Sequence, residues 1–175
     1  MRLGFAVKVT GRSDLPSNDA RRWQSGPHLR VSLGYLDAII DYLAATDIRM
    51  YRISSDLAPY VTHPDLPQFH QQIDECADEL AQLGAKARSL GIRLSFHPSQ
   101  FILLNSPDPA LVAKSVQDLA AQARMLDAMG DIHFETRLAL IFLASAGADG
   151  EISEEELEMI AEHLAPVLEQ VGGHP

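Results

Sequence analysis

The chain has 175 residues, 46% of them hydrophobic, which is enough to bury one sizeable core. It contains no run of ~20 apolar residues, so no membrane-spanning helix is predicted, and its apolar N-terminal stretch is too short for a signal peptide. The single cysteine, Cys76, has no partner for an internal disulfide, which favours a reducing, cytoplasmic setting.

The net charge of −10 is unevenly distributed along the chain. Residues 1–130 hold 14 acidic and 13 basic residues, whereas residues 131–175 hold 10 acidic residues and one basic residue. The acidity therefore belongs to the C-terminal part and does not exclude an anionic partner for the first part. We predict two parts, a domain over residues 1–130 and an acidic helical tail over residues 131–175.

In the first part, predicted strands and helices alternate. In chain order they are a strand over residues 3–9, a helix over 31–45 with Ser32 as its N-cap, a strand over 50–53, a long amphipathic helix over 68–90, a strand over 92–96 and a helix over 109–129. This order fits repeated right-handed βαβ units in a parallel sheet. The predicted fold is α/β: a partial TIM-type (β/α) barrel with three parallel βα units, followed by a C-terminal helical hairpin.

The hairpin is predicted from two helical patterns, over residues 135–146 and 153–171, with a turn between them. Residues 145–156 match part of a calcium-binding loop, but Ser145 and Gly147 stand where that loop needs carboxylates. The pattern therefore favours a helix–turn–helix over a calcium site, with Ser153 as the N-cap of the second helix.

A histidine stands at the end of the third predicted strand. Proline follows it at once, and proline lacks the N–H that a sheet ladder needs. The carboxyl ends of parallel strands are where α/β folds build their sites, so His97 is a candidate ligand or base. The alternative is a satisfied polar residue near a strand end. The same rim is expected to gather other polar side chains: Arg52, Ser54, Ser55, Asp56, His63 and Gln100.

Two loops carry further candidates. His63 lies in an irregular, proline-containing segment that no core pattern explains, and its alternative is a solvated loop histidine. Residues 21–24 combine two arginines with Trp23. Positive charge beside an aromatic ring suits a nucleic-acid backbone and base, although basic clusters also occur on ordinary surfaces.

Several segments, in the right order, resemble the UV damage endonuclease family. They are Leu3-Gly-Phe-Ala-Val, Arg49-Met-Tyr-Arg-Ile-Ser-Ser-Asp-Leu-Ala-Pro59, Tyr60-Val-Thr-His-Pro64, Ile92-Arg-Leu-Ser-Phe-His-Pro-Ser-Gln-Phe101, Leu104-Asn-Ser-Pro107 and Arg-Met-Leu-Asp-Ala-Met-Gly130. The resemblance covers about residues 1–130. A shorter stretch, residues 138–163, is similar to the TerB-like helical family.

The first resemblance implies a TIM barrel and a DNA-repair hydrolase of the excision-repair type. Such an enzyme nicks damaged double-stranded DNA immediately 5′ to UV photoproducts. The resemblance also implies a divalent metal cofactor, usually manganese. The implied mechanism is attack of a metal-activated water on the phosphodiester.

The same resemblance implies roles for five residues. His97 matches a metal-binding histidine, with Ser99 where the family has glycine. His63 matches a catalytic loop histidine beside the scissile phosphate. Gln100 and Phe101 match the pair that probes the damaged dinucleotide, and Phe5 stands where some members have a tyrosine. The last three are therefore candidate DNA-binding residues.

Beyond residue 130 the sequence departs from the family pattern. The next strand should end in Ile-His-x-Gly-Gly, but Ile132-His133-Phe-Glu-Thr stands there, and the later strands that complete the metal cluster are not evident. Two hypotheses follow, and whether this chain is an active enzyme stays open between them. One is an endonuclease, incomplete as this chain. The alternative is a non-catalytic binding module completed by another chain or by the tail, with open sheet edges that favour oligomers.

Overall fold

The computed structural model describes residues 3–130. The chain divides into two compact units, residues 1–97 with 128–131 and residues 98–127 with 132–175. The predicted tail hairpin and the calcium-like pattern lie outside the described residues. Within residues 3–130, no helix is long and apolar enough to cross a membrane.

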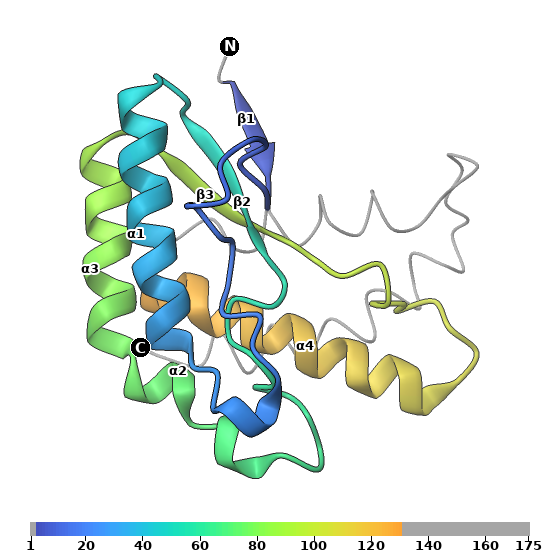
Figure 1. The fold of residues 1–175 in the computed structure, drawn as a ribbon. Helices are drawn as coiled ribbons and strands as arrows, with labels where there is room; N and C mark the ends of the chain where they lie inside the picture. The colour runs from blue at the N-terminus through green and yellow to red at the C-terminus, as the bar shows by residue number, and fades with distance from the viewer. Residues whose placement is uncertain (1–2, 131–175) are drawn as a thin grey trace. The chain divides into compact units, whose positions relative to one another are not determined.

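The first unit is built on a parallel sheet with the strand order β1-β2-β3 (Figure 1). The strands are β1 (Gly4–Ala6), β2 (Met50–Ser54) and β3 (Arg93–His97). The connections contain η1 (Trp23–Ser25) and α1 (Leu29–Ala45), then η2 (Pro67–Phe69), α2 (Gln72–Glu75) and α3 (Ala77–Ser89). In the register, Met50 pairs with both Gly4 and Arg93. The predicted succession of parallel βα units is confirmed.

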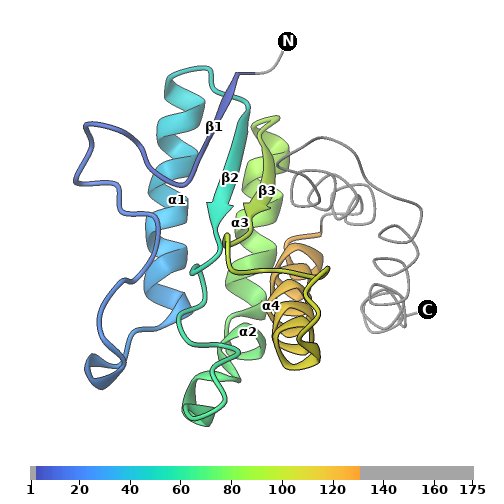
Figure 2. The same cartoon turned by 90° about the vertical axis from the view of Figure 1, so that its right-hand side faces the viewer.

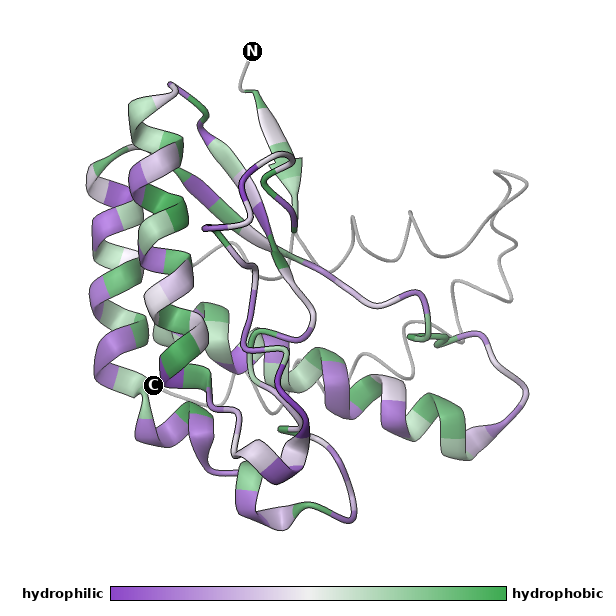
Figure 3. Ribbon diagram, in the orientation of Figure 1, coloured by the Kyte–Doolittle hydropathy of each residue, from purple (hydrophilic) through white to green (hydrophobic). Residues whose placement is uncertain are grey.

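One face of the sheet forms the core with two helices. Side chains alternate between the faces of a strand, and this face carries four residues that are at most 6% exposed: Tyr51, Ile53, Leu94 and Phe96. The helices α1 and α3 cover it (Figures 1 and 2). Polar and apolar residues interleave along both helices, as amphipathic packing requires (Figure 3). Their buried residues include Leu36, Ile40, Leu43, Leu80 and Ala87.

Two details of the helices differ from the prediction. Cys76 leaves helical geometry, with φ −116° and ψ 19°, so the expected helix over residues 68–90 is split into η2, α2 and α3. The apolar spacing continues across the break, because Ile73, Cys76 and Leu80 are all buried, and therefore does not reveal it. The N-cap of α1 is His28, whose Nδ1 accepts a hydrogen bond from Arg30 N at 3.1 Å. The predicted cap, Ser32, is a buried residue inside the helix.

Residues 128–130 pack directly on α3. The carbonyl of Met129 lies where a β-carbon on Gly84 would be, and that β-carbon would also come within 2.7 Å of the Met129 Cα. The Arg88 guanidinium donates to the carbonyls of Met129 and Gly130. Glycine at position 84 is therefore required by this close approach.

In the second unit, the structure describes the loop after β3 and most of α4 (Pro109–Ala128). The backbone N of Ala110 donates to Asp108 Oδ1 at 2.9 Å, which caps the start of the helix. Ser115, 2% exposed, accepts from Leu103 N at 3.0 Å and donates to Leu111 O at 2.8 Å. This buried hydroxyl ties the loop to α4.

Candidate functional site

The second face of the sheet is polar and ends in His97. The register pairs Arg52 with Ser95 and Ser54 with His97, so these four side chains share one face. His97 is the last residue of β3. The structure therefore places this histidine at the carboxyl end of a parallel strand, as its neighbouring proline predicts.

The surroundings of His97 favour its neutral form. Partial burial lowers the pKa of the imidazole from 6.5, and the positive charge of Arg52 lowers it further. His97 nevertheless remains solvent-exposed as a residue. A neutral, accessible imidazole is the form that accepts a proton or binds a metal.

We expect Arg52→Gln to raise the pKa of His97, because the substitution removes one of the two causes of the shift. The pKa of His97 is lower in the folded protein than in the unfolded chain, where it is about 6.5. As the pH falls from about 6.5 through the folded pKa, the unfolded chain binds the proton more readily, so the folded state loses stability. The variant should therefore lose less stability in that window. NMR titration of the imidazole gives the pKa directly.

Arg93→Gln is the matched control for that titration. Arg93 lies on the same face of β3 as His97, but it is not among the causes that lower the pKa of His97. The control should leave the histidine titration where it is. Equal titration curves for the wild-type protein and Arg52→Gln would contradict the assigned cause.

His63 lies in the loop that leaves the carboxyl end of β2, at the same edge of the sheet as His97. Its Nδ1 accepts a hydrogen bond from Asp65 N at 3.2 Å, and its ring meets Tyr60 edge-on at 6.2 Å between centroids. The neutral ring then carries its proton on Nε2. No residue of the described part is bonded to that Nε2–H, so it is available to donate to an oxygen of a ligand.

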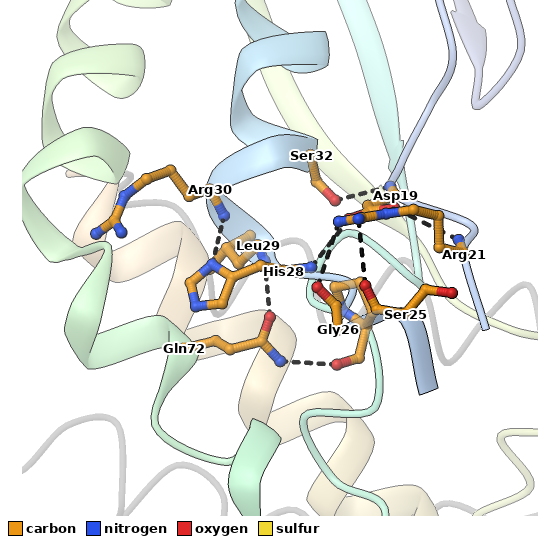
Figure 4. Close-up of polar contacts among 10 residues, drawn as sticks. Asp19, Arg21, Ser25, Gly26, His28, Leu29, Arg30, Ser32 and Gln72 are labelled. Atoms are coloured by element: carbon orange, nitrogen blue, oxygen red, sulfur yellow. Dashed lines mark hydrogen bonds and ion pairs between the residues drawn. The ribbon is translucent and has the colours of Figure 1, made fainter. Parts of the chain in front are cut away.

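A buried amide attaches this loop to α1 (Figure 4). Gln72 is 1% exposed. Its Nε2 donates to Pro59 O at 2.7 Å and to Phe69 O at 2.9 Å, and its Oε1 accepts from Leu29 N at 2.7 Å. One side chain thus satisfies three backbone groups. One feature of the sequence points to Gln72. It stands four positions before Cys76, which places a polar residue on the buried face of the predicted helix.

Phe5 lies on the opposite face of the sheet from His97. It pairs with Tyr51 in the register, and the two rings meet edge-on at 5.4 Å and 70°. Burial raises the pKa of Tyr51 to about 12, and its hydroxyl donates to Val7 O at 2.8 Å. Tyr51 is three residues from Ser54, so it and Phe5 point away from the polar face. The DNA-binding role of Phe5 stays a prediction.

Gln100 and Phe101 belong to the second unit. Both are exposed, and Phe101, at 71%, is the most exposed large apolar side chain of residues 3–130. Ser99 shapes their turn, because its Oγ accepts from Phe101 N at 3.3 Å and its carbonyl accepts from Ile102 N at 3.1 Å. Their role as a lesion-probing pair also stays a prediction.

The described residues do not by themselves fit a metal ion. Among them, no group of three or more His, Cys, Asp or Glu side chains is placed to hold one. The partner of His97 in the register is Ser54, and the cationic Arg52 lies near it, so neither of these two neighbours supplies a carboxylate. A divalent ion needs several nitrogen or oxygen donors, and one imidazole does not suffice.

The strands are parallel and lie in chain order, and each is followed by a helix. Polar side chains lie at their carboxyl ends. These features place the protein in the (β/α)-barrel class. The model of the family "UV-endonuclease UvdE" matches residues 32–171. The chain belongs to this family.

Known proteins support both the class and the family. A UV DNA damage endonuclease of Bacillus velezensis is 38% identical over 91 residues, covering 52% of this chain and 28% of that protein. A UV DNA damage endonuclease of Deinococcus radiodurans is 34% identical over 113 residues, covering 65% of this chain and 37% of that protein. The crystal structure of SacUVDE matches with a TM-score of 0.62 and 26% identity, over 74% of this chain and 46% of that chain. The chain therefore spans less than half the length of these relatives.

Proposed function

We propose that this chain is a DNA-repair protein of the UV endonuclease type. It binds damaged double-stranded DNA and nicks the phosphodiester on the 5′ side of a UV photoproduct. The observation that carries the proposal is the position of the exposed His97 at the carboxyl end of β3, where partial burial and Arg52 lower the pKa of its imidazole. Membership of the UvdE family supports the substrate class.

The proposed roles follow from the chemistry of each side chain. The Nε2–H of His63 donates to an oxygen of the scissile phosphate. The exposed ring of Phe101 stacks on a base that the lesion has unstacked, and the amide of Gln100 hydrogen-bonds its edge. The buried, unpaired thiol of Cys76 fits the cytoplasmic setting that we propose with this function.

The cofactor that we propose is a divalent metal, manganese by family resemblance, which activates water when bound. Ligands from beyond residues 3–130 are needed, because His97 is a single donor. These ligands come from the rest of this chain or from another chain. Manganese titration of the full chain by calorimetry tests this point, and stoichiometric binding that is lost in His97→Ala is the expected result.

A second function is a non-catalytic module that binds damaged DNA. One observation favours it: the candidate DNA-contacting residues Gln100 and Phe101 are exposed, whereas no group of three or more His, Cys, Asp or Glu side chains among residues 3–130 is placed to hold a metal ion. Such a module keeps the DNA-contacting residues, and another chain or the segment after residue 130 completes it.

Nicking of UV-irradiated supercoiled plasmid by the full chain, with manganese present, tests the first function. We expect nicked circles from the wild-type protein and none from His97→Ala. His28→Asn is the matched control, because asparagine retains the N-cap of α1 while removing a histidine. Tight binding of irradiated DNA without nicking supports the second function. A folded sample that neither binds nor nicks refutes both.

The lesion-probing role has its own pair of variants. Phe101→Ala should lower the preference for irradiated over intact duplex about tenfold, the effect typical of one lost base stack. Leu103→Ala removes another exposed apolar side chain, 41% exposed, from the same loop and should leave that preference unchanged. Competition binding with the two duplexes measures the ratio, and equal ratios for both variants would contradict the role.

A further inference from the structure

The loop between β1 and α1 exposes an aromatic ring beside a cation. Trp23 is 46% exposed, and Arg22 is exposed next to it. The loop leaves the carboxyl end of β1 and enters the amino end of α1, so it lies at the same edge of the sheet as His97 and the loop that carries His63. The sequence singles out residues 21–24 as a candidate nucleic-acid contact, and the function proposed above gives Arg22 and Trp23 no role.

Asp19 holds this loop in place (Figure 4). Its side chain is 2% exposed. The carboxylate accepts from Arg21 Nε at 2.7 Å and Nη2 at 2.6 Å, and from His28 N at 3.0 Å. Its backbone N donates to Ser32 Oγ at 2.9 Å. A single buried residue thus joins both ends of the segment 21–28 to α1.

The guanidinium of Arg21 also forms hydrogen bonds with the backbone inside the segment 21–28. It donates to Ser25 O at 3.2 Å and to Gly26 O at 3.3 Å. Gly26 ends the η1 turn in the left-handed region, with φ 58°, and its N donates to Trp23 O at 3.1 Å. The backbone under Trp23 is therefore already ordered, so little conformational entropy is lost when a ligand binds there.

Arg22 differs from the arginines on either side of it. Arg21 pairs with Asp19, and Arg30 pairs with Glu79 at 2.6 Å. Arg22 has no ion-pair partner among residues 3–130. Its charge is therefore available for an external anion, next to an indole ring with an exposed surface.

We propose that Arg22 and Trp23 form a second DNA contact, in which the indole stacks on an unstacked base and the guanidinium binds an adjacent phosphate. This inference rests on the proposed DNA-binding function and adds a stacking residue to it. A ring and a cation on adjacent residues match the alternation of base and phosphate in a locally opened strand.

The chain itself supplies the reporter for the test. Trp23 is its only tryptophan, so emission excited at 295 nm comes from this loop alone. The full chain is titrated with an unlabelled duplex that contains one thymine dimer, while a fluorescein-labelled copy of the duplex reports total binding by anisotropy. We expect quenching of Trp23 emission along the same binding curve.

Four variants complete the experiment. Trp23→Ala should weaken binding about tenfold and Trp23→Phe much less, since phenylalanine retains a stacking ring. Arg22→Gln should reduce the slope of log K against log salt by about 1. Arg30→Gln, the matched control, removes an exposed arginine already paired with Glu79 and should leave the slope unchanged.

The outcomes separate this contact from the proposed function. Normal anisotropy curves, with unchanged Trp23 emission and wild-type affinity in Trp23→Ala and Arg22→Gln, would overturn the contact and leave the function standing. An absence of anisotropy change with every duplex would overturn the function and the contact together.

Discussion

Replacing Gly84 with alanine is expected to cost about 3 kcal/mol of folding free energy, at the upper end for an overpacked site. The added β-carbon would overlap the carbonyl of Met129 and lie 2.6 Å from its carbonyl carbon. A backbone neighbour does not rotate away as a side chain does. Residues 128–130 would have to leave α3 and break the hydrogen bonds from Arg88. Urea unfolding followed by circular dichroism measures the loss.

Gly34→Ala is the matched control for Gly84→Ala. Gly34 lies inside α1 and is exposed, and a β-carbon there would meet nothing within 4 Å. Alanine should therefore stabilise the protein by about 0.5–1 kcal/mol, the difference in helix propensity. The two substitutions are chemically identical and should shift the urea midpoint in opposite directions. Equal midpoints would show that Met129 is not seated on α3.

Replacing Gln72 with alanine is the second large effect, also about 3 kcal/mol. The change leaves the Leu29 N–H and the carbonyls of Pro59 and Phe69 without their partner, and each unsatisfied buried group costs about 1–3 kcal/mol. Water entering the space left by the amide keeps the total below the full sum. The loop that carries His63 should also loosen, which limited proteolysis between residues 56 and 71 detects.

Gln71→Ala is the control for Gln72→Ala. It removes the same side chain one residue earlier, where the residue is exposed and makes no side-chain cap hydrogen bond. A change within about 0.5 kcal/mol and an unaltered cleavage pattern are expected. Similar losses in both variants would mean that the effect comes from helix propensity and not from the buried amide.

Local patterns predict the scaffold of residues 3–130 well. Alternation locates β2 and β3 to within a residue or so, and Gly91 and Gly130, with φ of 66° and 72°, end their helices as glycine does past a helix end. The break at Cys76 escapes prediction because apolar periodicity measures burial and not backbone geometry. The N-cap of α1 is not predicted either, because histidine is a less common N-cap than serine, and Ser32 is available nearby in the sequence.

The site is less predictable because its geometry depends on distant partners. The topology alone predicts which edge of the sheet holds the carboxyl ends of the strands. This is why the positions of His97 and His63 at that edge are predictable from the sequence. The face on which Phe5 lies depends on strand register. The partners of Asp19 and Gln72 lie up to 13 and 43 residues away, so no local motif contains them.

The hydrogen bonds of Gln72 also bear on how this protein is able to evolve. All three of its partners are backbone atoms, so mutations that change the side chains at positions 29, 59 and 69 leave these bonds available. The constraint therefore falls on position 72 alone. The exposed side chains of this loop at positions 63–65 can therefore change, and with them its ligand contacts, while the attachment of the loop to α1 persists.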